Sequence, residues 1–101
     1  MPQRVRVAAA ADIPDDSGLA VKCGKEEIAV FRIEGAYYAC SARCPHAGGP
    51  LADGFLDGTS VSCPWHGWAF ELNCMGAAPR DGVERYRVIA EGDDLFIELP
   101  D

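Results

Sequence analysis

Two short motifs that contain both histidines of the chain constrain what this sequence can fold into more than any other feature. The first motif is Cys44-Pro45-His46 and the second is Cys63-Pro64-Trp65-His66. Each offers one thiolate and one imidazole, which are side chains that bind metals. The common two-Cys, two-His zinc finger places both cysteines before both histidines, whereas here each motif carries a mixed pair. This arrangement suits a two-metal centre with unlike ends.

The residues around these motifs resemble the two cluster-binding loops of Rieske [2Fe-2S] proteins. The resemblance covers residues 44–51, read CPHAGGPL, and residues 63–68, read CPWHGW. In that family two histidines replace two of the four cysteines on one iron. The resemblance therefore implies one Rieske-type [2Fe-2S] cluster, with Cys44 and Cys63 on one iron and His46 and His66 on the other. A structural zinc-binding interaction module is the alternative of a different class, and it would give a colourless protein.

Three cysteines remain after these ligands are assigned, and an odd remainder fits a reducing compartment. Cys23 and Cys40 sit in runs typical of strands, and we interpret both as small apolar residues. Cys74 follows the second motif closely. A reactive role or a role as an alternative ligand stays open for Cys74.

The net charge and the hydropathy of this 101-residue chain limit which partners and which cellular location we expect. Sixteen acidic against nine basic side chains give a formal net charge of -7, which argues against nucleic acid and favours docking onto a basic patch of a partner protein. The apolar run before Asp12 is too short for a signal peptide. No run approaches the roughly 20 apolar residues that cross a membrane. We therefore expect a soluble, cytoplasmic protein with no membrane association.

Short alternating runs rich in Val, Ile, Phe and Tyr predict an all-β fold. The turns between successive runs leave no place for a crossover helix, so the strands should pair antiparallel. We expect a single Rieske domain over residues 1–101, with a β-sandwich or meander base formed by residues 1–40 and 81–101 and an inserted cluster-binding subdomain at about residues 41–80. The expected strands are residues 3–9, 19–23, 27–33, 36–40, 55–56, 60–63, 68–72, 85–91 and 95–99.

The residues beside the ligands distinguish between kinds of Rieske protein. Respiratory members carry one extra cysteine in each loop, joined as a disulfide, and Gly49 and Trp65 stand at the corresponding positions here. Those members also tend to have a Ser and a Tyr that donate hydrogen bonds to the cluster, where this chain has Trp68 and Phe70. Fewer donors stabilise the reduced state less, so the resemblance implies a potential near the low end of the Rieske range, around -150 mV.

Two smaller features of the loops also bear on function. We expect Gly48, Gly49 and Gly67 to let backbone N–H groups approach the cluster sulfides, with ordinary turn chemistry as the alternative. Trp65 has two readings as well, because a large aromatic side chain either shields the cluster or contacts a partner, or else lies in the core.

The resemblance then implies a function among the low-potential members. Ring-hydroxylating oxygenase subunits add a mononuclear iron that needs further histidines, and this chain has only two. We therefore expect a one-electron carrier, not an enzyme, that takes electrons from a flavin-dependent ferredoxin reductase and delivers them to a terminal aromatic-ring-hydroxylating oxygenase. The small Rieske subunit of an assimilatory nitrite reductase is the alternative within electron transfer.

Overall fold

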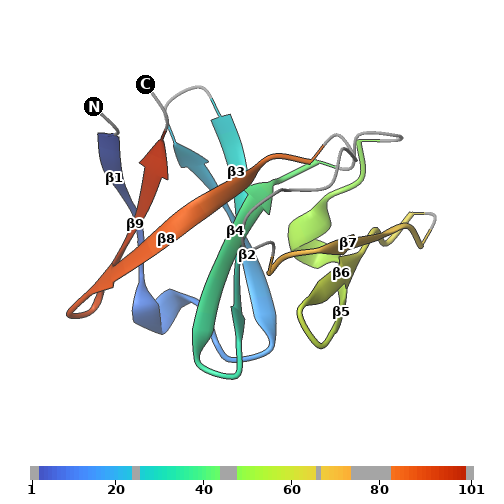
Figure 1. The fold of residues 1–101 in the computed structure, drawn as a ribbon, viewed down its shortest axis with the longest axis horizontal. Coiled ribbons are helices and arrows are strands. Elements are labelled where there is room, and N and C mark those ends of the chain that lie inside the picture. The colour runs from blue at the N-terminus through green and yellow to red at the C-terminus, as the bar shows by residue number, and fades with distance from the viewer. Residues whose placement is uncertain (1–2, 24–25, 44–47, 66, 74–82, 100–101) are drawn as a thin grey trace.

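The described residues of the chain form nine antiparallel strands in two sheets (Figure 1). The computed structural model describes residues 3–23, 26–43, 48–65, 67–73 and 83–99. Six strands form the larger sheet, in the order β1-β9-β8-β4-β3-β2, and three form the smaller sheet, in the order β5-β6-β7. The bounds of the strands are β1 Gln3–Ala9, β2 Ser17–Cys23, β3 Glu26–Ile33, β4 Ala36–Ser41, β5 Phe55–Asp57, β6 Ser60–Ser62, β7 Ala69–Glu71, β8 Arg85–Glu91 and β9 Asp94–Leu99.

The all-β, antiparallel fold predicted from the sequence is confirmed, and each predicted strand overlaps one strand of the structure. Two short 3₁₀ helices were not predicted, η1 at Ala10–Asp12 and η2 at Leu51–Asp53. Each spans only three residues, which is too short for a periodic hydrophobic pattern to reveal it. No helix among the described residues is long and apolar enough to cross a membrane.

Strand β3 is the centre of the fold because both of its faces are buried. Ile28 and Val30 point into one core cluster, which also contains Leu95 and Ile97 of β9. Alternate residues of a strand point to opposite faces, so Ala29, Phe31 and Ile33 enter a second cluster. A strand buried on both faces reads as a continuous apolar run, as the segment IAVF at residues 28–31 does.

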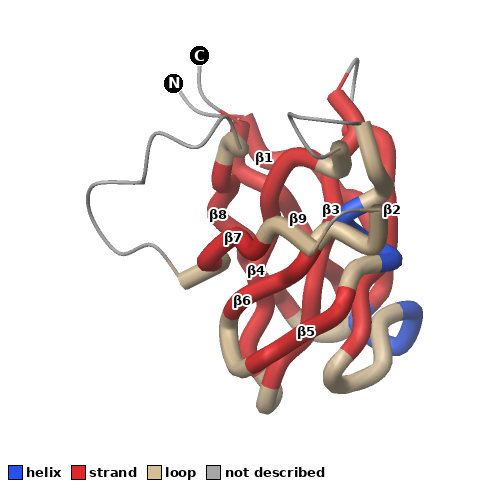
Figure 2. Tube along the Cα trace, turned by 90° about the vertical axis from the view of Figure 1, so that its right-hand side faces the viewer, coloured by secondary structure: helices blue, strands red, loops and turns tan. Residues whose placement is uncertain are grey.

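The second core cluster joins the small sheet to the larger one. Val61 of β6 and Phe70 of β7 are almost fully buried and pack in the same cluster as Phe31. Their paired position across β6 and β7 places them on one face of the small sheet. The small sheet therefore lies against one side of the larger sheet, as two views of the chain show (Figures 1 and 2). This packing fixes where the chain enters and leaves the second motif.

The carboxylate of Glu71, on β7, stabilises the end of the small sheet that lies opposite Cys63. The carboxylate accepts hydrogen bonds from Thr59 Oγ1, from Ser60 Oγ at 3.2 Å and from the backbone N–H of Asn73 at 3.0 Å. These bonds lower the pKa of Glu71 below its ordinary value, and the bond from the Thr59 hydroxyl has the largest effect.

We predict that this carboxylate makes the stability of the protein depend on acid pH. A depressed folded-state pKa contributes stability above the unfolded-state pKa of about 4.3, and the contribution is lost as pH falls through the folded-state pKa. The free energy of unfolding, measured by urea denaturation, should therefore fall less steeply below about pH 4.3 in Glu71→Gln than in the wild type. Parallel pH profiles for the two proteins would contradict this role.

Candidate metal centre

The second motif forms the tight end of the β6–β7 hairpin. Cys63 follows β6 directly, and its backbone N–H donates a hydrogen bond to the Trp68 carbonyl at 2.8 Å. The backbone N–H of Gly67 donates to the Cys63 carbonyl at 2.9 Å. Gly67 has φ +76°, in the left-handed region that glycine adopts without a steric penalty. The turn therefore holds the backbone of Cys63 through both its N–H and its carbonyl.

The side chain of Cys63 is anchored in the core. It is 1% exposed and belongs to the core cluster that contains Val61 and Phe70. Neighbours of this kind restrict the rotamers that a side chain can adopt. The thiol of Cys63 is thus placed by packing as well as by the turn.

Backbone pairing closes the first motif at its base. Arg43 and Pro50 form an isolated antiparallel bridge, and the N–H of Leu51 donates to the Ala42 carbonyl at 2.8 Å. Leu51 itself is fully buried and begins η2. The two ends of the segment that contains Cys44 and His46 are therefore held side by side.

The side chain of Arg43 ties this segment to the larger sheet. Its Nε lies 3.0 Å from Glu27 Oε1 on β3, and its Nη1 donates to the Gly48 carbonyl at 3.2 Å. Sequence reasoning missed Arg43. A lone arginine before a ligand motif has no distinctive spacing, and only the fold brings Glu27 opposite it.

Gly49 lies three residues after the first motif, in the same loop, and this loop meets the second motif there. A Cβ atom placed on Gly49 would lie 2.7 Å from Cys63 Sγ and 3.2 Å from Cγ and Cδ2 of the Trp65 indole. Real Cβ atoms essentially never come within 3.0 Å of another heavy atom, so only glycine allows the backbone of this loop to approach the thiol of the second motif.

The close approach of Gly49 to Cys63 Sγ bears on whether the residues present fit an iron–sulfur cluster. A cluster bound between the loops needs a thiolate of one motif directed toward the other motif, and Cys63 Sγ has that direction. Two thiolates and two imidazoles are also a donor set that [2Fe-2S] centres use. The described part of the site therefore fits the group.

Three of the four predicted ligands, Cys44, His46 and His66, lie outside the described residues, as does Cys74. The interpretation of Cys23 and Cys40 as small apolar residues is confirmed, because both are buried thiols on strands. Burial and the nearby Glu26 carboxylate raise the pKa of the Cys23 thiol, which disfavours a reactive thiolate there.

The glycine predictions have mixed outcomes. The N–H of Gly67 donates within its own turn, as ordinary turn chemistry requires. Gly49 makes the close approach described above. Gly48 has φ +72° and adopts the same left-handed conformation as Gly67. Whether Gly48 or Gly49 donates to a cluster sulfide stays a prediction.

Exposed aromatic side chains gather near the motifs. Among the described residues, the large apolar side chains that are exposed are Phe55 at 69%, Trp65 at 62% and Trp68 at 53%. The core reading of Trp65 is therefore wrong. All three lie between the start of β5 and the start of β7. Large apolar side chains are usually buried, so a group of exposed ones often marks a contact surface.

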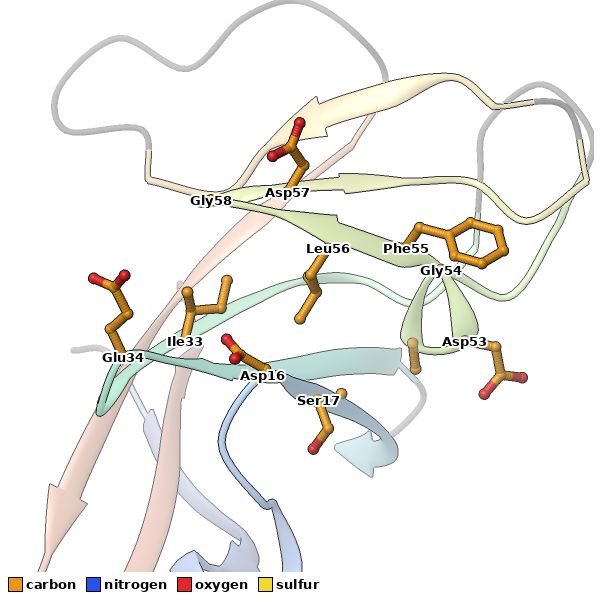
Figure 3. Close-up of a pocket in the computed structure, with 12 residues that line it drawn as sticks. Asp16, Ser17, Ile33, Glu34, Asp53, Gly54, Phe55, Leu56, Asp57 and Gly58 are labelled. Atoms are coloured by element: carbon orange, nitrogen blue, oxygen red, sulfur yellow. The ribbon is translucent and has the colours of Figure 1, made fainter.

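A separate groove of about 620 Å³ runs between β5 and the turn after β3 (Figure 3). Leu56 points from β5 into the space between the two sheets, whereas Asp57 points to the other side of the strand. Four acidic residues are among those that line the groove, Asp16, Glu34, Asp53 and Asp57. No ion pair involves any of them within the part of the chain that the structure describes. Since none of its lining residues belongs to either motif, the groove is not the metal centre.

Comparisons with known proteins agree with this arrangement. Residues 3–86 match the family described as Rieske [2Fe-2S] domain. The chain is 34% identical to the 3-phenylpropionate/cinnamic acid dioxygenase ferredoxin subunit of Escherichia coli (strain K12), over 97% of this chain and 95% of that protein.

Solved structures give the same relation. The chain superimposes on Sphingomonas yanoikuyae B1 ferredoxin with a TM-score of 0.81 and 29% identity, over 97% of this chain and 100% of that one. It also superimposes on a chain from the complex of reduced oxygenase and oxidized ferredoxin in carbazole 1,9a-dioxygenase. That match has a TM-score of 0.79 and 28% identity, over 94% of this chain and 92% of that one.

We predict that Gly67→Ala lowers the free energy of unfolding by about 1–2 kcal/mol, because a Cβ in the left-handed region is sterically disfavoured. Gly67→Asn should cost less, since asparagine tolerates this conformation better than alanine does. Thermal denaturation of both variants beside the wild type measures the difference. Equal stabilities for Gly67→Ala and the wild type would contradict the turn as described.

Proposed function

The chain belongs to the Rieske [2Fe-2S] domain family, and from that premise we propose that it is a one-electron carrier between a flavin-dependent ferredoxin reductase and a terminal aromatic-ring-hydroxylating oxygenase. The observation that carries the proposal is the 34% identity, along almost the whole chain, to a dioxygenase ferredoxin subunit. The protein is thus the electron-transfer component of a multicomponent system and not an enzyme itself.

The cofactor of this carrier is one Rieske-type [2Fe-2S] cluster, which takes up and gives back a single electron when bound. In our proposal its ligands are Cys44, His46, Cys63 and His66, within a cluster-binding subdomain of about residues 41–80. The burial of Cys63 and the direction of its thiol toward Gly49 support this assignment. The remaining residues of the single domain, 1–40 and 81–101, form the base.

A solved relative supports the oxygenase as a partner. One similar chain comes from a complex of reduced oxygenase with oxidized ferredoxin. We propose the corresponding contact for this chain, together with a cytoplasmic location. The buried thiol of Cys23 supports such a reducing compartment.

The side chains at positions 68 and 70 support a low potential. Phe70 is 2% exposed and packs in the core, and Trp68 carries an indole in place of a hydroxyl. Neither side chain can donate an O–H hydrogen bond to a cluster sulfide or thiolate. Fewer such donors leave the reduced state less stabilised.

We predict that the purified protein contains iron and acid-labile sulfide in equal amounts and shows the visible absorption of an iron–sulfur cluster. Cys63→Ser should lose or alter this absorption, because it removes a thiolate ligand. Cys23→Ser and Cys40→Ser are matched controls and should leave the spectrum unchanged, since both thiols lie on strands of the base. A wild-type protein with zinc and no labile sulfide would refute the proposed function.

The acidic surface supports docking to a basic partner. Asp53 and Asp57 belong to the segment between the two motifs, and within the described residues neither has an ion-pair partner. Asp93 lies in the β8–β9 turn, which Figure 1 shows at the end of the molecule away from the small sheet. Exposed charges act over about 8 Å at physiological ionic strength, so the first two should matter more to a partner that docks at the motifs.

We predict that the rate of electron transfer to the oxygenase, followed as reductant-dependent substrate turnover, falls as salt rises. The double variant Asp53→Asn/Asp57→Asn should lower the rate at low salt and flatten this dependence. The double variant Asp93→Asn/Glu98→Gln removes the same charge and should change both less. A rate independent of salt in the wild type would mean that docking is chiefly apolar.

A further inference from the structure

The Trp65 indole has an unusual environment for an exposed aromatic side chain. It is 62% exposed, yet its Cγ and Cδ2 atoms lie where a Cβ of Gly49 would be only 3.2 Å away. One edge of the indole therefore packs on the backbone of the loop that follows the first motif, while most of the ring faces solvent. Trp65 belongs to the second motif, so this contact connects the second motif to the loop that carries the first.

Cys63 Sγ lies in the same small space. The same position on Gly49 is 2.7 Å from Sγ, and Cys63 is 1% exposed. The thiol of Cys63 and the indole of Trp65 thus both lie on the side of Gly49 where another residue would carry its side chain. The core cluster encloses Cys63 from the other side, because Val61 and Phe70 belong to that cluster.

No disulfide joins the two motifs at these positions, since a glycine and a tryptophan occupy them. Among the described residues, Arg43 links the start of the loop that carries the first motif to Glu27 of β3, and Leu51 at its end lies in the core cluster that also contains Cys63. The contact of Trp65 with Gly49 is a further connection to the second motif, and it is made on the exposed side of Cys63 by packing alone. An indole offers a large apolar surface for such packing.

We propose that Trp65 is a positioning residue, which holds the two motifs together by packing on Gly49 and keeps water away from the Cys63 thiolate. The inference rests on the proposed function, since it assumes that Cys63 is a ligand. Two consequences follow for the holoprotein. Without the indole the motifs separate more easily, so iron leaves faster. Water also reaches the thiolate, which favours the more negative reduced state and raises the midpoint potential.

The test compares Trp65→Ala, Trp65→Phe and Trp68→Ala as purified holoproteins. Trp68 is the matched control, because its indole is 53% exposed and belongs to the same hairpin end. Iron release from the oxidised protein to a chelator should be about tenfold faster in Trp65→Ala, in line with the cost of outer-shell substitutions at metal sites. The midpoint potential of Trp65→Ala should shift to more positive values, Trp65→Phe should lie between, and Trp68→Ala should match the wild type.

Gly49→Ala tests the other side of the contact. Its Cβ would collide with Cys63 Sγ and press on the indole, so iron release should accelerate in this variant too. In the double variant Gly49→Ala/Trp65→Ala the combined effect should be smaller than the sum of the two, because part of the Gly49→Ala effect acts through the same contact with the indole. Additive effects would overturn the proposal, as would an unchanged release rate or an unchanged potential in Trp65→Ala.

The proposed function and this inference fail separately. A wild-type protein without iron and labile sulfide refutes the proposed function before any variant is compared. The contact is then judged in that same protein by alkylation of Cys63, followed by peptide mass spectrometry. Trp65→Ala should accelerate alkylation and Trp68→Ala should not, and equal rates in the wild type and Trp65→Ala would overturn the packing role.

Discussion

The close approach of the Gly49 backbone to the Cys63 thiol is the constraint on which the candidate metal centre depends. It places parts of two motifs, far apart in the chain, against each other with no room for a single extra carbon atom. Such contact requires that both motifs be held from behind. The second motif is held by the core cluster and the β6–β7 turn, and the first by its closure at Arg43 and Pro50. The two sheets and their core clusters hold the core cluster around Cys63 and the closure at Arg43 and Pro50 in place.

Strand β3 connects the supports. Its two buried faces join both core clusters, so the position of the small sheet is coupled to that of the larger sheet. Glu27 on the same strand receives the Arg43 side chain. An exposed ion pair of this kind contributes about 0–1 kcal/mol, so its main effect is on the direction of the chain near Gly48.

Burial and exposure also divide the roles of the residues around the second motif. Phe70 is buried and holds the small sheet in place, whereas Trp65 and Trp68 present their rings to solvent beside Cys63. A one-electron carrier needs its redox group close to a surface that partners can reach, and it also needs that group protected from free exchange with water. An indole that packs along one edge and stays exposed elsewhere meets both requirements.

Much of this protein was determined by the sequence alone. Strand positions followed from alternating apolar runs and short turns, because those patterns act over a few neighbouring residues. The candidate metal centre was predicted from two motifs whose residue types and spacing suit an iron–sulfur cluster, and its four ligands stay a prediction. The burial of Cys23 and Cys40 followed from their places within strand-like runs.

Only the tertiary structure decided how distant residues meet. The contact of Gly49 with Trp65, the reach of Arg43 to Glu27 and the exposure of Trp65 join segments whose separation in the chain carries no periodic signal. The sequence left Trp65 equally compatible with a core residue and a surface residue, because a large aromatic is suited to both. Its place was decided by the tight β6–β7 turn, which directs the indole outward along the backbone of Gly49 and leaves the core to Phe70.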